Sequence, residues 1–135
     1  MDILATLLRA AQLYAHAAHN AAKGPTYFAD HDFLGEAYGA YEAAYDKVVE
    51  RSIGQGEAVD FAAIGRNAAA DAGRFPDPMT FSNQSSFGVL LDYERKICAE
   101  IDRIYADAST GTQNLLAQIA DDSEHRQYKI GQRLK

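Results

Sequence analysis

Apolar residues recur every three or four positions along most of this chain, which is the spacing of one face of an α-helix. The first such stretch runs from Leu4 through Ala18 and predicts a helix over residues 2–22. Gly24 and Pro25 end it, because proline cannot continue a helix and glycine accepts turn conformations.

Three more long stretches follow the same pattern. The next helix continues to Ile53, with Asp30 or Asp32 as its cap, and the remaining two cover Phe87 to Ala108 and Thr112 to Leu134. The second helix carries a stripe of large apolar residues, in which we assign the three tyrosines to packing. This stripe consists of Leu34, Tyr38, Tyr41, Tyr45, Val48 and Val49.

A long connection, residues 54–82, separates the second and third long helices and contains one short amphipathic segment near residues 60–72. Antiparallel neighbours need only short loops, whereas a parallel neighbour needs a connection that returns along the bundle. We therefore predict an all-α fold, a four-helix bundle with a long crossover that contains a short helix. From the length of the chain we expect residues 1–135 to form a single domain.

Composition narrows the possible partners. The formal net charge of −6 opposes attraction to nucleic-acid phosphates, so charge does not favour DNA binding. No apolar run approaches the ~20 residues that span a bilayer, and the N-terminus does not resemble a signal peptide, so we expect a cytoplasmic protein without a membrane partner. The single cysteine, Cys98, is expected to be a buried thiol.

Four side chains suggest an iron site: His19 and His31 on either side of the predicted turn, then Asp46 and Glu50 one helical turn apart. A hairpin at the turn could bring both imidazoles to one point. His31 and Asp46, however, are 15 positions apart on one helix, or roughly 22 Å. Two copies packed antiparallel about a two-fold axis would place the histidines of one chain beside the carboxylates of the other.

These residues carry a resemblance to a known family. The first half of the chain resembles the Dps mini-ferritins, the DNA-protection-during-starvation family, a branch of the ferritin-like proteins. The last helix, from Thr112 to Leu134, is similar to that family's last helix. The matching positions of the first half are His19, Lys23-Gly24-Pro25, Phe28-Ala29, His31, Leu34, Tyr38, Asp46 and Glu50-Arg51.

The resemblance implies a ferritin-like bundle and a ferroxidase site. In that family two histidines of one subunit and two carboxylates of its two-fold partner bind iron inside a hollow dodecamer, and His19, His31, Asp46 and Glu50 match those positions. It thus implies a homo-oligomer that oxidises Fe(II), stores Fe(III) and protects against oxidative damage.

Several positions depart from the family pattern. Gly35 stands where many members carry a further acidic ligand, so we expect weak iron binding and slow oxidation. Asn20 replaces a usual tryptophan, which leaves a tyrosine as the redox-damping aromatic. The start of the last helix is uncharged, whereas the family's segment there is usually acidic. The lysine-rich N-terminal arm with which family members bind DNA is absent, although a few basic groups repeated by symmetry could together still bind DNA.

Other interpretations remain open at this level. His16 and His19 share a helix face and could bind a divalent metal themselves, or the histidines could simply form hydrogen bonds around the turn. Asp46 and Glu50 could form ordinary surface pairs with neighbouring cations. The protein could then be a ferritin-like assembly or DNA-associated scaffold with an inactive site, or a plain four-helix interaction module.

Overall fold

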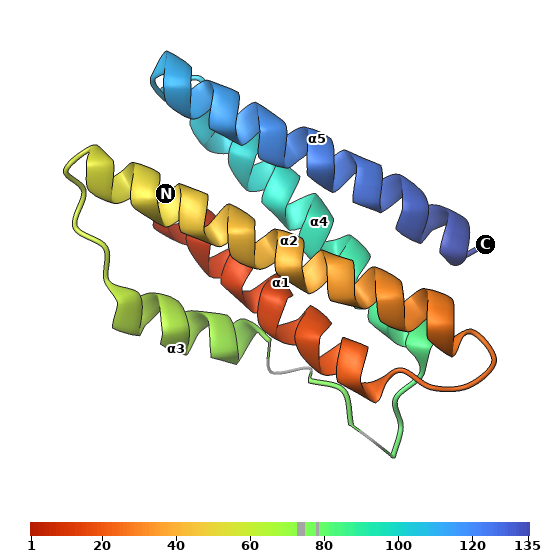
Figure 1. Ribbon diagram of the computed structural model, residues 1–135. Coiled ribbons are helices and arrows are strands. Elements are labelled where there is room, and N and C mark those ends of the chain that lie inside the picture. Colours follow the sequence, from red (N-terminus) through yellow and green to blue (C-terminus); the bar gives the residue numbers. More distant parts are fainter. Residues whose placement is uncertain (73–74, 78) are drawn as a thin grey trace.

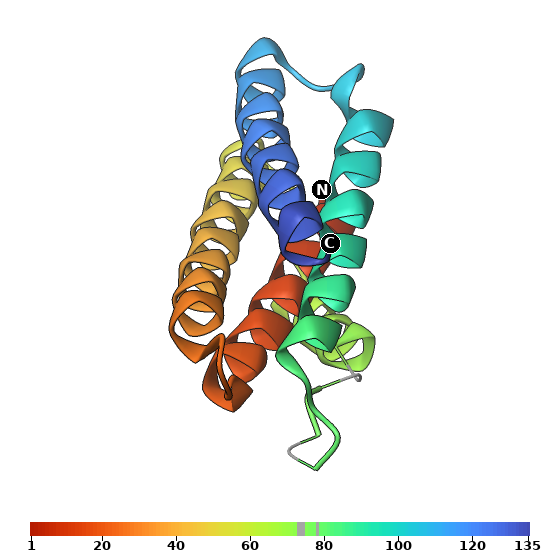
Figure 2. The same cartoon turned by 90° about the vertical axis from the view of Figure 1, so that its right-hand side faces the viewer.

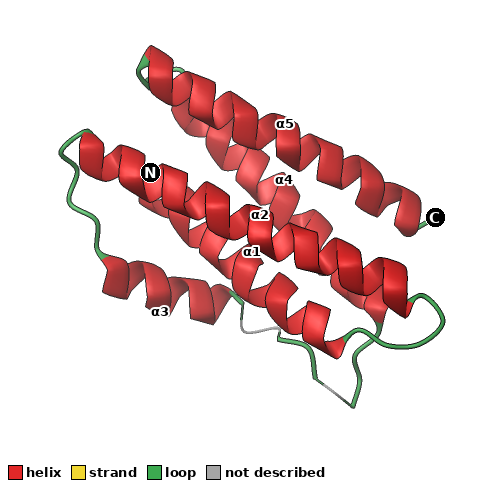
Figure 3. Ribbon diagram, viewed as in Figure 1, coloured by secondary structure: helices red, strands yellow, loops and turns green. Residues whose placement is uncertain are grey.

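The computed structural model describes residues 1–72, 75–77 and 79–135, which contain five helices and no strand (Figures 1 and 3). None of these described helices has the length and apolarity needed to cross a membrane. The helices are α1 (Asp2–Ala21), α2 (Tyr27–Gly54), α3 (Phe61–Asp71), α4 (Asn83–Tyr105) and α5 (Thr110–Arg133).

The four long helices form a bundle of two hairpins, α1 with α2 and α4 with α5 (Figures 1 and 2). Helices α2 and α4 run in the same direction and are joined by the long connection, which confirms the predicted crossover. The short helix α3 lies outside the bundle against α1. Figure 2 shows α2 at the edge of the bundle, with one flank free of other helices.

Some helices begin before the predicted residue, because a polar side chain caps the backbone ahead of the apolar stripe. Ser82 and Ser109 accept hydrogen bonds from backbone amides three residues later, so α4 and α5 begin before their apolar stripes do. The prediction that Asp30 or Asp32 caps the second helix was wrong, because α2 already begins at Tyr27. Asp30 is instead buried and forms an ion pair with Arg133, N–O 2.9 Å.

The centre of the bundle contains a charged network. Glu94 is fully buried and accepts hydrogen bonds from the hydroxyls of Tyr41 and Ser123 and from the Arg126 guanidinium. Burial, together with the neighbouring Glu94 carboxylate, raises the pKa of Tyr41 well above its ordinary value, so its phenol remains a donor. Tyr41 thus packs in the core, as predicted, and Cys98, expected to be buried, is only partly so.

Candidate metal site

The turn between α1 and α2 is held by a group of polar side chains. Gly24 adopts a positive φ of 85°, a conformation that glycine accepts without strain. Asn83, at the start of α4, bonds both the backbone amide and the carbonyl of Lys23 and also donates to the Asp30 carboxylate. The C-terminal helix reaches the same point through Arg133, so three helices fix this turn.

Asp30 is the acceptor at the centre of this group. Burial alone would raise its pKa, but hydrogen bonds from Arg133, Thr26 and Asn83 lower it below its ordinary value. The carboxyl is therefore ionised at neutral pH and holds α5 against the start of α2. This role of Asp30 could not be predicted from the residue pattern, because its partners Asn83 and Arg133 are remote from it along the chain.

The turn brings His19 and His31 together, as predicted. Their rings stack with centroids 3.7 Å apart and planes inclined by 23°. His19 Nδ1 lies 2.8 Å from the backbone oxygen of His31, and His31 Nδ1 lies 2.9 Å from the backbone oxygen of His19. Each histidine therefore orients the other through reciprocal hydrogen bonds.

These hydrogen bonds determine which ring nitrogen remains available. A carbonyl oxygen can only accept, so Nδ1 must carry the proton in each ring. In the neutral imidazole, Nε2 then keeps its lone pair, and no protein partner for it exists among the described residues. Metal-binding histidines are commonly oriented in this way, by a backbone carbonyl on the other nitrogen.

Gly35 lies directly against the His19 ring. A Cβ added at this position would approach Cε1 and Nδ1 of His19 to 3.1 Å, closer than most real contacts. The acidic residue that the family pattern has here could not be added without displacing that ring. The glycine is therefore part of the geometry of this histidine pair, a role that the sequence alone did not reveal.

Two tyrosines extend the histidine stack. Tyr27 stacks on His31 with centroids 4.8 Å apart, and Tyr38 meets the edge of His19 at 5.4 Å. His16 is exposed and stacks on Tyr38 at 4.3 Å, while its ring centroid is 6.5 Å from that of His19. Tyr38 is partly buried and packs against the core, as predicted, and it also borders the histidine pair.

The predicted carboxylates lie elsewhere on α2. Asp46 and Glu50 are exposed, and within the described residues neither forms an ion pair with Lys47, Arg51 or another cation. The alternative that Asp46 and Glu50 form surface ion pairs with neighbouring cations is therefore not observed in the described part of the chain. No three histidine, cysteine or acidic side chains of the described part of one chain cluster closely enough to hold a metal ion.

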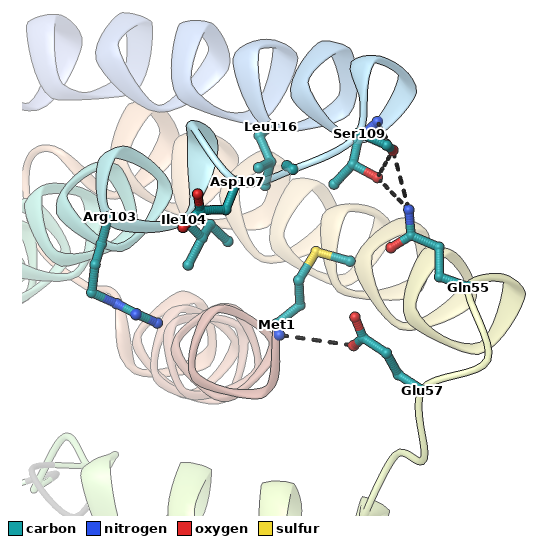
Figure 4. Close-up of a pocket in the computed structure, with 10 residues that line it drawn as sticks. Met1, Gln55, Glu57, Arg103, Ile104, Asp107, Ser109 and Leu116 are labelled. Carbon is teal, nitrogen blue, oxygen red and sulfur yellow. Dashed lines mark hydrogen bonds and ion pairs between the residues drawn. The ribbon is translucent and has the colours of Figure 1, made fainter.

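A separate cavity of about 340 Å³ lies at the opposite end of the bundle (Figure 4). The Met1 amine and the Glu57 carboxylate approach each other there, N–O 3.9 Å, and Arg103 and Asp107 contribute further charges. The cavity contains none of the four predicted ligands.

Comparison with known proteins places this fold in a family. The model of the ferritin-like domain matches residues 2–135, nearly the whole chain. The chain therefore belongs to the ferritin-like domain family, whose members are generally iron-binding or iron-storage proteins and typically oligomerise. No curated protein matches the chain.

Proposed function

We propose that this protein is a Dps-like mini-ferritin, which binds and oxidises Fe(II) at sites shared between two copies and stores Fe(III) in a hollow oligomer. The observation that carries the proposal is the stacked pair His19 and His31, whose rings are oriented by backbone carbonyls at Nδ1 and whose Nε2 atoms have no hydrogen-bond partner among the described residues. We further propose that the oligomer is a dodecamer built from two-fold dimers and that it protects against oxidative damage.

The donor set suits iron. Neutral imidazole and carboxylate are ligands that Fe(II) accepts, and the carboxylates of Asp46 and Glu50 would also stabilise Fe(III). Because the rings of His19 and His31 are nearly parallel and their centroids are 3.7 Å apart, their in-plane lone pairs cannot converge on one ion. Each imidazole would therefore bind its own iron.

The proposed second copy requires a particular helix register. If His31 faces the midpoint of Asp46 and Glu50 on the partner subunit, the two-fold axis passes beside residues 39 and 40. Gly39 is exposed, and a Cβ there would meet nothing within 4 Å in its own chain. An exposed glycine inside a helix costs about 1 kcal/mol relative to alanine. Close packing of a second α2 helix against Gly39 would explain why a glycine stands there despite that cost.

Exposed apolar residues at both ends of this α2 face also favour antiparallel pairing with a second copy of the chain. Phe28 and Asp46 are 18 positions apart, five full helical turns, so both lie on this face, and Ile53 lies close to the same direction. Phe28 is 80 % exposed and Ile53 is 53 % exposed. The antiparallel register would place Phe28 near Ile53 of the partner subunit. Burying both side chains there would stabilise the dimer.

The chemistry then follows from the ligands. Two bound Fe(II) ions each give up one electron, and together they reduce one hydrogen peroxide, with two protons, to two waters. Dioxygen is the alternative oxidant. Open coordination positions on each ion would admit the oxidant, since each ring supplies one nitrogen only.

Anaerobic isothermal titration of Fe(II) into the metal-free protein tests this proposal. The Asp46→Ala/Glu50→Ala variant should lose at least ~10-fold in affinity, because each ion loses anionic ligands. Asp121→Ala/Glu124→Ala removes the same charge from exposed positions of α5 and should bind as wild type. Equal binding by all three proteins would reject the shared site.

A second candidate function keeps the assembly but not the oxidation. The contact of Gly35 with His19 favours it, because the site has no room for a further acidic ligand beside that ring. Aerobic Fe(II) addition to the purified oligomer distinguishes the two. A ferroxidase would accumulate an Fe(III) core, visible by electron microscopy and absorbance, whereas a scaffold with a degenerate site would leave the iron to precipitate outside.

A further inference from the structure

A groove of about 500 Å³ follows the flank of α2 that turns toward α5. Gln55 lines both this groove and the cavity of Figure 4 and donates hydrogen bonds to Ser109 and Thr112, so it separates the two. The groove is lined by Lys47, Glu50, Arg51, Gly54, Gln55 and Leu115.

Arg51 is the unusual residue in this groove. Its side chain is partly buried, yet within the described residues its guanidinium makes only one hydrogen bond, a long one of 3.5 Å to the Thr112 hydroxyl. A guanidinium carries five N–H donors, so most of them have no protein acceptor in this part of the chain. No buried side-chain nitrogen of the described residues lacks a partner, so these donors reach the solvent in the groove, where a dissolved anion can accept hydrogen bonds from them.

The positive charges around Arg51 also favour the binding of an anion. Its Nη1 lies so close to α5 that a Cβ at Gly111 would approach it to 3.0 Å. Gly111 belongs to the first turn of α5, where the helix dipole is positive and disfavours a neighbouring cation. Lys47, one helical turn before Arg51, adds a second positive charge, and it has no ion pair among the residues that the structure describes.

We propose that Arg51 and Lys47 form an oxyanion site that takes inorganic phosphate or a similar tetrahedral anion in this groove. The planar guanidinium can donate two parallel hydrogen bonds to such an anion, and the ammonium adds a point charge. Among the described residues that line the groove, Glu50 is the only acidic one, so the two cations outnumber it. This anion site requires no iron, so phosphate binding can be tested separately from the proposed ferroxidase activity.

Titration of inorganic phosphate into the full-length, metal-free protein tests the proposal, by calorimetry at constant ionic strength maintained with chloride. We expect saturable binding to wild type and at least a tenfold loss of affinity in Arg51→Gln and in Lys47→Gln/Arg51→Gln. Arg51→Lys should bind more weakly than wild type and more tightly than Arg51→Gln, because it keeps the charge but loses the planar fork. Arg66→Gln removes an exposed cation from α3 and should change nothing.

Thermal unfolding gives a second reading that does not depend on calorimetric heat. Phosphate should raise the unfolding midpoint of wild type and of Arg66→Gln, relative to chloride, but not that of Arg51→Gln. No saturable binding to wild type, or equal binding by wild type and Arg51→Gln, would overturn the site. Either result would leave the Arg51 donors to water or to a neighbouring copy.

Discussion

Replacing Gly35 with alanine separates the stability of α2 from the geometry of the histidine pair. Alanine is favoured over glycine inside a helix by about 1 kcal/mol. At this position, however, the new Cβ would lie 3.1 Å from two atoms of the His19 ring. The ring can retreat only by lengthening the 2.8 Å hydrogen bond to the His31 carbonyl and disturbing the stack.

The two effects nearly cancel in stability but not in binding. A weakened hydrogen bond of this kind costs about 1 kcal/mol, so the net change in unfolding free energy is close to zero. The matched control is Gly88→Ala in α4, where the Cβ meets nothing within 4 Å and the full gain of about 1 kcal/mol should appear. Urea unfolding of both variants would measure the difference between them.

Fe(II) affinity provides the second measurement. Displacing an oriented imidazole typically lowers metal affinity by about 10–100-fold, so Gly35→Ala should bind Fe(II) at least tenfold more weakly than wild type. Gly88→Ala should bind as wild type. If Gly35→Ala gained as much stability as Gly88→Ala and bound Fe(II) unchanged, Gly35 would not confine the His19 ring and our explanation of this glycine would be wrong.

Three further changes test other parts of the molecule. Glu94→Gln leaves the buried guanidinium beside it without a counter-charge and should cost about 3–5 kcal/mol in urea unfolding, whereas a loss below 1 kcal/mol would mean that the network is not as tight as described. Asp30→Asn should destabilise the protein at neutral pH by about 2 kcal/mol. Because folding lowers the pKa of Asp30, its stabilisation by Arg133 is present above about pH 4 and is lost as the pH falls further. The unfolding free energies of wild type and variant should therefore converge in acid, and a constant difference would contradict the ionic role. Gly39→Leu should block close approach of two α2 helices and produce monomers in light scattering, while Gly65→Leu on α3 should not; an unchanged oligomer would exclude this helix register.

Periodicity was sufficient to predict the helices of this fold. The apolar stripes of α1, α2, α4 and α5 identified the four long helices, and the long α2–α4 connection with its amphipathic segment identified the crossover and the short helix. The beginnings of helices were less predictable, because they depend on individual polar side chains. Asp30 has the chemistry of a helix cap, but its actual partner, Arg133, is 103 residues away in sequence.

The candidate site was only partly accessible to the same reasoning. The hairpin explains why His19 and His31 meet, since the turn between them can be recognised from Gly24 and Pro25. Hydrogen bonding around the turn was one of the alternatives that the sequence left open, and both histidines do form such bonds. Their reciprocal pattern depends on the backbone path of that turn. Gly35 shows the same limit, because its absent side chain gives space to a ring from another helix.

The salt bridge between Glu94 and Arg126 also bears on how this protein would tolerate metal removal. The polar centre of the bundle already contains a cation that is covalently part of the chain, so the buried Glu94 carboxylate is neutralised without a metal ion. Chelators should accordingly leave the helical circular dichroism and the unfolding midpoint of the isolated subunit unchanged, in contrast to small domains that unfold without their metal. Under the proposed iron-storage function, iron would therefore bind and leave without unfolding the subunit.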